Sequence, residues 1–227
     1  MTWEIINVTL DSFGKEKRDR MNDKKAFQEI NSYFFTVLFV ILNIVLFLIC
    51  TFTGNLLYNK GAFYIWSIIT DKEYYRFISA VFLHYDINHI FSNMILLFFI
   101  GRIVEKQVGH IAYFFLYLMA GICGNFVSGF WEMKSEQYSV SVGASGAVFG
   151  LTGALLVLVL FHKGRLEQIR WQGVILMSAL SVYNGFTTDN INNAAHIGGL
   201  LTGILITIIV LIGKEALKSH TWKGAGT

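Results

Sequence analysis

The chain has 227 residues, of which 54% are hydrophobic and only 15% are charged. Its apolar residues gather into blocks of membrane-spanning length, so the composition indicates a polytopic membrane protein rather than a water-soluble domain. The formal net charge of +3 is small and spread over several loops, which argues against nucleic acid as a partner.

Six apolar blocks have the length that a bilayer core requires, about 17 to 25 residues. They predict membrane spans at residues 33–53, 87–104, 111–130, 141–162, 171–187 and 193–212. An even number of spans places both termini on one side of the membrane, and 14 of the 18 Lys and Arg residues fall on that side. By the positive-inside rule, we expect both termini to be cytoplasmic.

The predicted spans divide the chain into three parts. Residues 1–32 form a cytosolic N-terminal segment, residues 33–213 a six-helix membrane domain, and residues 214–227 a short cytosolic tail. The first 30 residues carry six acidic and six basic side chains, a balance that argues against an organellar transit peptide. The compact plan without a targeting segment favours a bacterial plasma membrane.

The connection between the first two spans, residues 54–86, is rich in aromatic residues but has too many polar interruptions to be a span. We expect it to lie in the interface, with Trp66, Tyr74 and Tyr75 at headgroup depth. Arg76 has two possible roles: its side chain snorkels to the headgroups, or its guanidinium ties the segment to backbone carbonyls. Snorkelling is the commoner behaviour and is the prediction for Arg76.

Seven polar residues inside or beside the apolar blocks are hard to explain as lipid-facing. They are His84, His89, Asn93, Ser145, Asn192, Asn193 and His196. With cytoplasmic termini, the second, fourth and sixth spans all run inward, so each of these groups falls in the outer part of the membrane. Ser145 and His196 each lie four or five residues into their spans, about 6 to 8 Å deep, so we expect their side chains to meet.

Glycines at helical spacing indicate where the helices touch. They are Gly146, Gly150 and Gly153 on the fourth span, and Gly199 and Gly203, on the stripe of His196, on the sixth. Two such grooves packed together bring an imidazole on one helix within reach of a hydroxyl on the other. Packing alone also explains a glycine-flanked serine, so the glycines by themselves do not establish chemistry.

A serine hydroxyl becomes an effective nucleophile when a neutral histidine accepts its proton. Ser145 and His196 are the candidates for these two roles. His89 and Asn93 are four residues apart, so they share one face of the second span and offer donors to an oxyanion, as do backbone amides near Ser145. The sequence therefore contains the parts of a serine hydrolase.

Three short motifs contain the candidate residues. They are "HYDINHIFSN", with a His-x4-His-x3-Asn pattern at His84, His89 and Asn93, "GASG", with a Gly-x-Ser-Gly pattern at Ser145, and "AHIGGLLTG", which contains His196 on the sixth span. Together they resemble the motifs of the rhomboid intramembrane serine proteases. The resemblance covers residues 33–213. It implies an all-α membrane protein, a six-transmembrane-helix rhomboid-like bundle with an interfacial first loop.

The resemblance also implies roles for individual residues. Ser145 would be the nucleophile and His196 the general base of a catalytic dyad without a carboxylate. His89 and Asn93 would line the oxyanion hole, and His84 would belong to a supporting polar network. The fifth span would form the lateral side by which a substrate enters.

Other residues would support this site. The helices would pack there through four glycines, Gly146, Gly150, Gly199 and Gly203. Glu105 matches an acidic position of the family at the inner end of the second span, and we expect it to be structural. Two positions depart from the pattern of many members: Tyr75 precedes Arg76 in place of a tryptophan, and Phe149 replaces a tyrosine. We expect Phe149 still to stack on the imidazole of His196.

The implied activity is that of a serine endopeptidase, which hydrolyses peptide bonds in or near the transmembrane segment of single-span membrane proteins. Its surroundings would be the lipid bilayer, and the reaction would need no metal and no organic cofactor.

Three alternative functions fit the sequence less well. A rhomboid-like protein that binds transmembrane partners without cutting them would be expected to lack Ser145 or His196, and both are present. A transporter would show broken helices or paired inverted halves, and no second "GASG"-like half is visible. A metalloprotease is disfavoured because His84 and His89, five residues apart, do not share a helix face.

Overall fold

The computed structural model describes residues 28–166, 168–187 and 192–224. The predicted cytosolic segment 1–32 therefore lies almost entirely outside the described residues. The described residues are mostly helical, with one small two-stranded sheet. Their elements are α2 (Phe34–Phe52), α3 (Leu56–Gly61), α4 (Ile65–Thr70), α5 (Arg76–Ser79), η1 (Ala80–Phe82), α6 (Ile87–Val108), α7 (His110–Ser135), α8 (Ser145–Phe161), β1 (Arg165–Leu166), β2 (Ile169–Arg170), α9 (Trp171–Thr187) and α10 (Asn193–Gly224).

Each predicted span corresponds to one long helix. Within the described residues, α2, α6, α7 and α10 are long and apolar enough to cross a membrane, so the chain is a multi-pass membrane protein. α8 and α9 have 17 residues each. Such a helix is about 26 Å long, slightly less than a hydrocarbon core of about 30 Å. α10 continues without a break past residue 213, where the sequence predicts the start of the tail.

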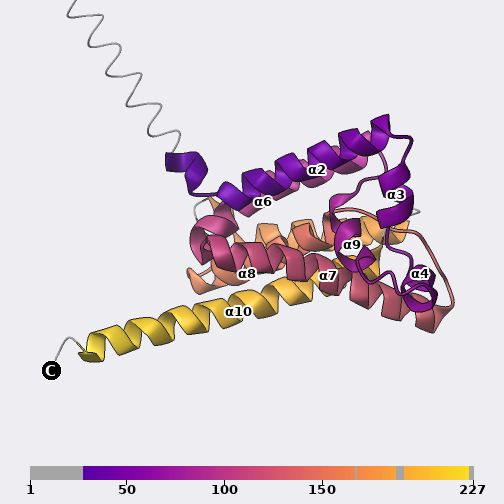
Figure 1. The fold of residues 1–227 in the computed structure, drawn as a ribbon. Coiled ribbons are helices and arrows are strands. Elements are labelled where there is room, and N and C mark those ends of the chain that lie inside the picture. The colour runs from indigo at the N-terminus through magenta and orange to yellow at the C-terminus, as the bar shows by residue number, and fades with distance from the viewer. Residues whose placement is uncertain (1–27, 167, 188–191, 225–227) are drawn as a thin grey trace, which may run out of the picture.

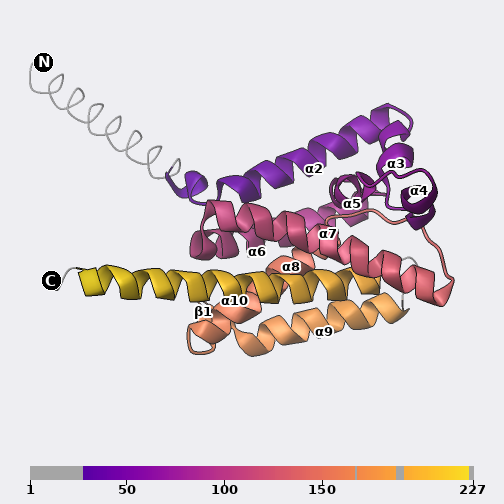
Figure 2. The same cartoon turned by 60° about the horizontal axis from the view of Figure 1, so that its bottom comes forward.

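The helices form one bundle with α8 near its centre (Figure 1). α10 packs along α8 and α7, and α2 lies against α6. α9 lies at the edge of the bundle, beside α8 and α10 (Figure 2). The short helices α3 and α4 gather at one end of the bundle, and the C-terminal part of α10 projects from the other.

The N-terminal end of α2 is capped by a side chain from α6. The first N–H groups of a helix have no partners within that helix. The Glu105 carboxylate accepts hydrogen bonds from the backbone N–H groups of Phe35 (2.9 Å) and Thr36 (2.8 Å), and from His110 Nδ1 (2.6 Å). Its negative charge also suits the positive end of the helix dipole. Glu105 therefore has the structural role expected of it.

The segment 54–86 folds as a small unit at the end of the bundle, built from α3, α4, α5 and η1. It has an apolar cluster of its own, made of Phe63, Ile65, Ile68, Phe77 and Ala80. Trp66, Tyr74 and Tyr75 are exposed, in keeping with the predicted interfacial position.

The prediction that Arg76 snorkels is wrong. Its side chain is only 9% exposed, and its guanidinium donates to the carbonyl oxygens of Ala62 (2.6 Å) and Asn59 (3.4 Å). Both carbonyls lie at the C-terminal end of α3, where they have no partners within the helix, so Arg76 satisfies them. Arg76 Nε also donates to Glu73 Oε2 at 2.6 Å, which lowers the pKa of the Glu73 carboxyl by stabilising its charged form.

The fourth span begins later than predicted. Residues 141–144 are not helical, and α8 starts at Ser145. Ser141 pairs with Phe63 through two backbone hydrogen bonds, of 2.9 and 3.0 Å. Gly143 has φ +132°, a conformation that residues with a side chain rarely adopt. Ser145 is thus the first residue of its helix rather than one turn inside it, whereas His196 is the fourth residue of α10. The prediction that each residue lies four or five residues into its helix therefore holds for His196 and is wrong for Ser145.

Candidate active site

A serine and a histidine from different helices are joined by a hydrogen bond. Ser145 Oγ lies 3.0 Å from His196 Nε2, a good distance for a hydroxyl that donates to an unprotonated ring nitrogen. Ser145 is half-buried, and His196 is 8% exposed. The predicted meeting of these two side chains is confirmed.

The close approach of α8 and α10 depends on glycines. A Cβ atom on Gly199 would collide with the carbonyl oxygen of Gly146, and one on Gly203 would collide with the carbonyl oxygen of Gly150. Main chain therefore lies directly against main chain, as small residues permit between membrane helices. The two predicted grooves do pack together, and this packing brings the histidine to the serine.

The imidazole of His196 is held by stacking. The ring of Phe149, one turn after Ser145, lies on it with centroids 4.2 Å apart and 11° between the ring planes, so the predicted stacking is confirmed. The buried Nδ1 atom of His196 has no hydrogen-bond partner among the described residues. That part of the chain therefore supplies a serine–histidine pair with no carboxylate behind the histidine.

Two more histidines lie against the segment that enters α8. His84 Nε2 accepts a hydrogen bond from the backbone N–H of Ala144 (3.5 Å), and its ring meets that of His89 edge-on at 5.1 Å. A Cβ atom on Gly143 would lie 2.7 Å from the His89 ring, so this ring covers the glycine. Burial, with a smaller contribution from His89, lowers the pKa of His84 to about 3, and the neutral ring can therefore accept the hydrogen bond.

Asn93 lies one turn after His89 on the same face of α6, as the spacing predicts. It is 4% exposed, and its Nδ2 donates to the carbonyl oxygen of His89 at 3.1 Å. An asparagine amide has two donor hydrogens, so one remains for another acceptor. The start of α6 is fixed by Asp86, whose side chain accepts the backbone N–H of His89 at 2.8 Å.

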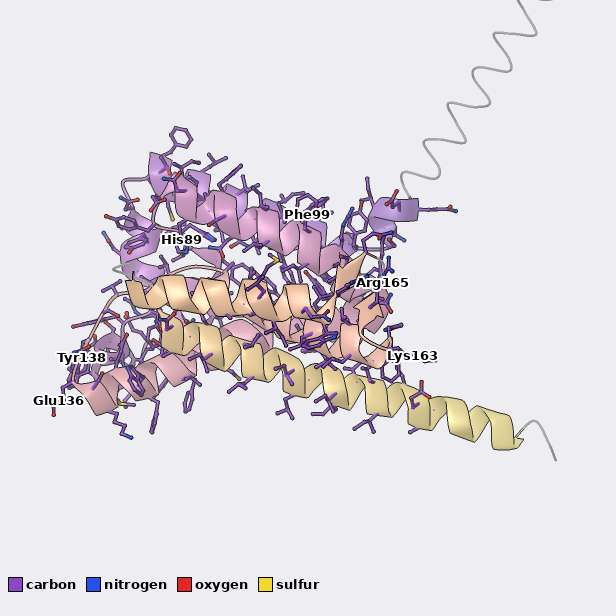
Figure 3. The ribbon with its side chains drawn as sticks, turned by 180° about the vertical axis from the view of Figure 1, so that it is seen from behind. His89, Phe99, Glu136, Tyr138, Lys163 and Arg165 are labelled. Carbon is purple, nitrogen blue, oxygen red and sulfur yellow. The ribbon has the colours of Figure 1, made fainter. Side chains whose placement is uncertain are left out.

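The candidate site lies towards one end of the bundle. Figure 3 shows His89 at the end that also carries Glu136 and Tyr138, whereas Lys163 and Arg165 lie at the opposite end. Lys163 and Arg165 lie between the fourth and fifth predicted spans, on the side predicted to be cytoplasmic, and are thus at the other end of the bundle from His89.

Asn192, which has no role in the predicted site, caps α10 in the structure. Its Oδ1 accepts the backbone N–H of Ala195 at 3.0 Å, which makes Asn192 the N-cap of α10. Its Nδ2 donates to Ser128 Oγ on α7 (2.6 Å) and to Ser141 Oγ (3.3 Å). The signal in the sequence is an asparagine directly before a predicted helix, which is typical of an N-cap.

Comparisons with known proteins identify the family of the chain. The family model described as the rhomboid domain matches residues 71–213, more than half of the chain. The chain is 33% identical to "Putative rhomboid protease YdcA" of Bacillus subtilis over 165 residues, which cover 73% of this chain and 76% of YdcA. It is 31% identical to "Rhomboid protease GluP" of the same organism over 193 residues, which cover 83% of this chain.

The lengths of the relatives differ. The chain spans only 37% of GluP, and 48% of "RHOMBOID-like protein 5" of Arabidopsis thaliana, to which it is 34% identical over 150 residues, 65% of this chain. The match to the family model nevertheless includes His84, Ser145 and His196, together with the whole of the α8–α10 contact described above. On these grounds, the chain belongs to the rhomboid family.

Proposed function

We propose that this chain is an intramembrane serine endopeptidase, with Ser145 as its nucleophile and His196 as its general base. The observation that carries the proposal is the 3.0 Å hydrogen bond between Ser145 Oγ and His196 Nε2. A general base has to lie within hydrogen-bond reach of the proton that it removes, and this pair meets that condition. Membership of the rhomboid family supports the same reaction class.

The reaction would proceed through an acyl-enzyme. His196 Nε2 accepts the proton of Ser145 while Oγ attacks the carbonyl carbon of the scissile peptide bond, and the carbonyl electron pair moves onto its oxygen. When this tetrahedral intermediate collapses, the C–N bond breaks and the imidazolium gives its proton to the leaving amine. Water then attacks the ester on Ser145, with His196 again as the base, and releases the acid product.

The oxyanion needs hydrogen-bond donors that are already in place. We assign this role to the side chains of His89 and Asn93, since Asn93 has one amide hydrogen beyond the one bound to the His89 carbonyl. The N–H groups in the first turn of α8 and the positive end of its dipole point to the same region, because Ser145 begins that helix. His84 supports the site indirectly, through its hydrogen bond with Ala144.

We also propose a membrane setting for this reaction. All six long helices within residues 33–213 would span the plasma membrane of a bacterium, with residues 1–32 and 214–227 in the cytosol. The position of His89 at the end away from Lys163 and Arg165 supports a site in the outer half of the membrane. The substrates would be single-span membrane proteins, and no step above needs a metal or an organic cofactor.

The experiment that tests this proposal uses the purified protein in detergent and a fluorophosphonate probe, which reacts with activated serines. We expect the wild type to be labelled, and Ser145→Ala and His196→Ala to remain unlabelled while keeping the wild-type melting temperature. A chelator should not change the labelling. Cleavage of a single-span test substrate in liposomes should follow the same pattern. A folded wild type that neither reacts with the probe nor cleaves would instead favour a non-proteolytic binder of transmembrane helices.

A further inference from the structure

One polar side chain joins three segments around the candidate site. Asn192 caps α10 through Ala195, donates to Ser128 on α7, and donates to Ser141 in the non-helical segment that leads into α8. Ser128 is 1% exposed, so its hydroxyl is held in a protein environment rather than in solvent. In such an environment a hydrogen bond between neutral groups is stronger than the same bond in water.

Ser141 and Asn192 hold equivalent positions relative to Ser145 and His196. Ser141 lies four residues before Ser145, and Asn192 lies four residues before His196. The hydrogen bond from Asn192 to Ser141 thus joins the chain just before the serine to the chain just before the histidine. It forms a second bridge, parallel to the Oγ to Nε2 bridge, between the same two segments.

The two residues of this bridge, Ser141 and Asn192, are also bound to other segments. Ser141 is paired through its backbone with Phe63 in the first loop. On the same segment, the Ser139 hydroxyl donates to Glu132 on α7 at 2.8 Å. Asn192, through Ser128, is fixed to the same helix as Glu132. α7 therefore serves as the common support on which the two segments are aligned.

We propose that Asn192 is a positioning residue, which uses Ser128 and Ser141 to hold the first turn of α10, and with it His196, in register with Ser145. The inference rests on the proposed serine endopeptidase activity and adds a residue that governs its rate. Asn192 makes no contact with the reacting atoms in this role. Small displacements of a general base from its nucleophile lower the reaction rate strongly, so the bridge should affect reactivity more than stability.

Two substitutions separate positioning from capping. Asn192→Ser keeps an oxygen that can cap α10, but its side chain is too short to reach both serines. Ser141→Ala removes the link to the α8 segment and leaves the cap untouched. Ser141→Thr restores the hydroxyl, and Ser135→Ala is the matched control, because the Ser135 hydroxyl bonds only within its own helix.

The experiment measures the rate of fluorophosphonate labelling, kcat and KM on a single-span substrate, and the melting temperature of each variant. We expect Asn192→Ser and Ser141→Ala to lower the labelling rate and kcat about tenfold, with KM unchanged and the melting temperature within about 2 °C of the wild type. Ser141→Thr and Ser135→Ala should react at close to the wild-type rate.

The possible outcomes separate this inference from the proposed function. An Asn192→Ser protein that reacts at the wild-type rate, or equal slowing in Ser141→Ala and Ser141→Thr, would overturn the positioning role alone. A rate loss that merely follows a fall in melting temperature would overturn it as well, because the role would then be structural. A folded wild type that does not react with the probe would overturn the proposed function itself.

Discussion

Two helices of equal length, α8 and α9, occupy very different environments. Both have 17 residues and both correspond to a predicted span. α8 lies near the centre of the bundle, where Leu151 and Ala154 are fully buried. α9 lies at the edge, and Ile175, Leu176 and Met177 on it are 44%, 60% and 56% exposed. α8 is the more apolar of the two helices, yet α9 is the one at the edge, so apolar composition by itself does not decide which helix faces outward.

The size of the interfacial residues explains the difference. α8 carries glycines where it meets its neighbours, and Gly150 lies so close to Ala120 of α7 that a Cβ atom would collide with it. On α9, by contrast, a Cβ atom added to Gly173 would have nothing within 4 Å. Ser145 therefore belongs to a helix with little room to shift, and substitutions on α9 should be tolerated far better.

Gly203→Ala should be the most damaging substitution, because it disrupts the α8–α10 contact. The added Cβ atom would strike the carbonyl oxygen of Gly150, which is part of a helix backbone and cannot rotate away. We expect a loss of about 3 kcal/mol or more in the free energy of unfolding, and no fluorophosphonate labelling. The measurement is thermal unfolding in detergent. Gly213→Ala on the same helix is the matched control, because its Cβ atom would meet nothing within 4 Å. Equal stability of the two variants would contradict the packing described here.

Truncating one leucine on α8 and one on α9 measures how differently the two helices are packed. Leu151→Ala on α8 leaves a cavity in a closely packed region, and we expect it to cost about 2 kcal/mol or more. Leu176→Ala on α9 removes a largely exposed side chain and should change the free energy of unfolding by less than about 0.5 kcal/mol. Unfolding of both variants by a denaturing detergent measures the difference. Similar losses at the two positions would mean that α9 packs as tightly as α8.

Phe149→Leu tests how α8 orients the histidine. The substitution removes the aromatic face on which the His196 ring stacks, an interaction of about 1 kcal/mol. We expect the labelling rate to fall about fivefold, with a smaller effect on stability than Leu151→Ala has. Phe149→Tyr keeps the ring and should retain the wild-type rate. If the leucine variant reacts as fast as the wild type, stacking does not hold the imidazole in its reactive position.

The smallest expected effect is that of Gly173→Ala on α9. The new methyl group meets no neighbour, and alanine favours a helix more than glycine does, so stability should rise by at most about 1 kcal/mol. Thermal unfolding measures the change. The Gly203→Ala variant, which has the same substitution on α10, is measured for comparison. A marked fall in the melting temperature would show that the edge helix has a tight contact at Gly173.

Part of the site could be predicted from local spacing. The interval between Gly199 and Gly203 identified the face of α10 that meets α8, because helical geometry places residues four apart on one side. The same rule put His89 and Asn93 on one face of α6. These predictions held because the residues concerned lie within regular helices, where sequence distance translates directly into position.

Other features could not be predicted in this way. The start of α8 depends on the pairing of Ser141 with Phe63, nearly 80 residues earlier in the chain. The role of Arg76 depends on where the carbonyls at the end of α3 come to lie. Asn192 carries a recognisable N-cap signal, but its contacts with Ser128 and Ser141 come from segments distant in sequence. Each of these features is a long-range contact, which local patterns do not encode.

The amino-acid sequence was sufficient to predict a multi-pass membrane protein with six apolar blocks, and it contained the motif residues Ser145 and His196. It could do so because the length of a span is set by the thickness of the bilayer, and because a motif is a local pattern. Three features result from tertiary packing: Ser145 begins its helix, Phe149 lies on the imidazole, and Asn192 joins the segments that precede Ser145 and His196. These outcomes depend on which backbones approach closely enough to touch, and that approach is the result of packing all the helices together.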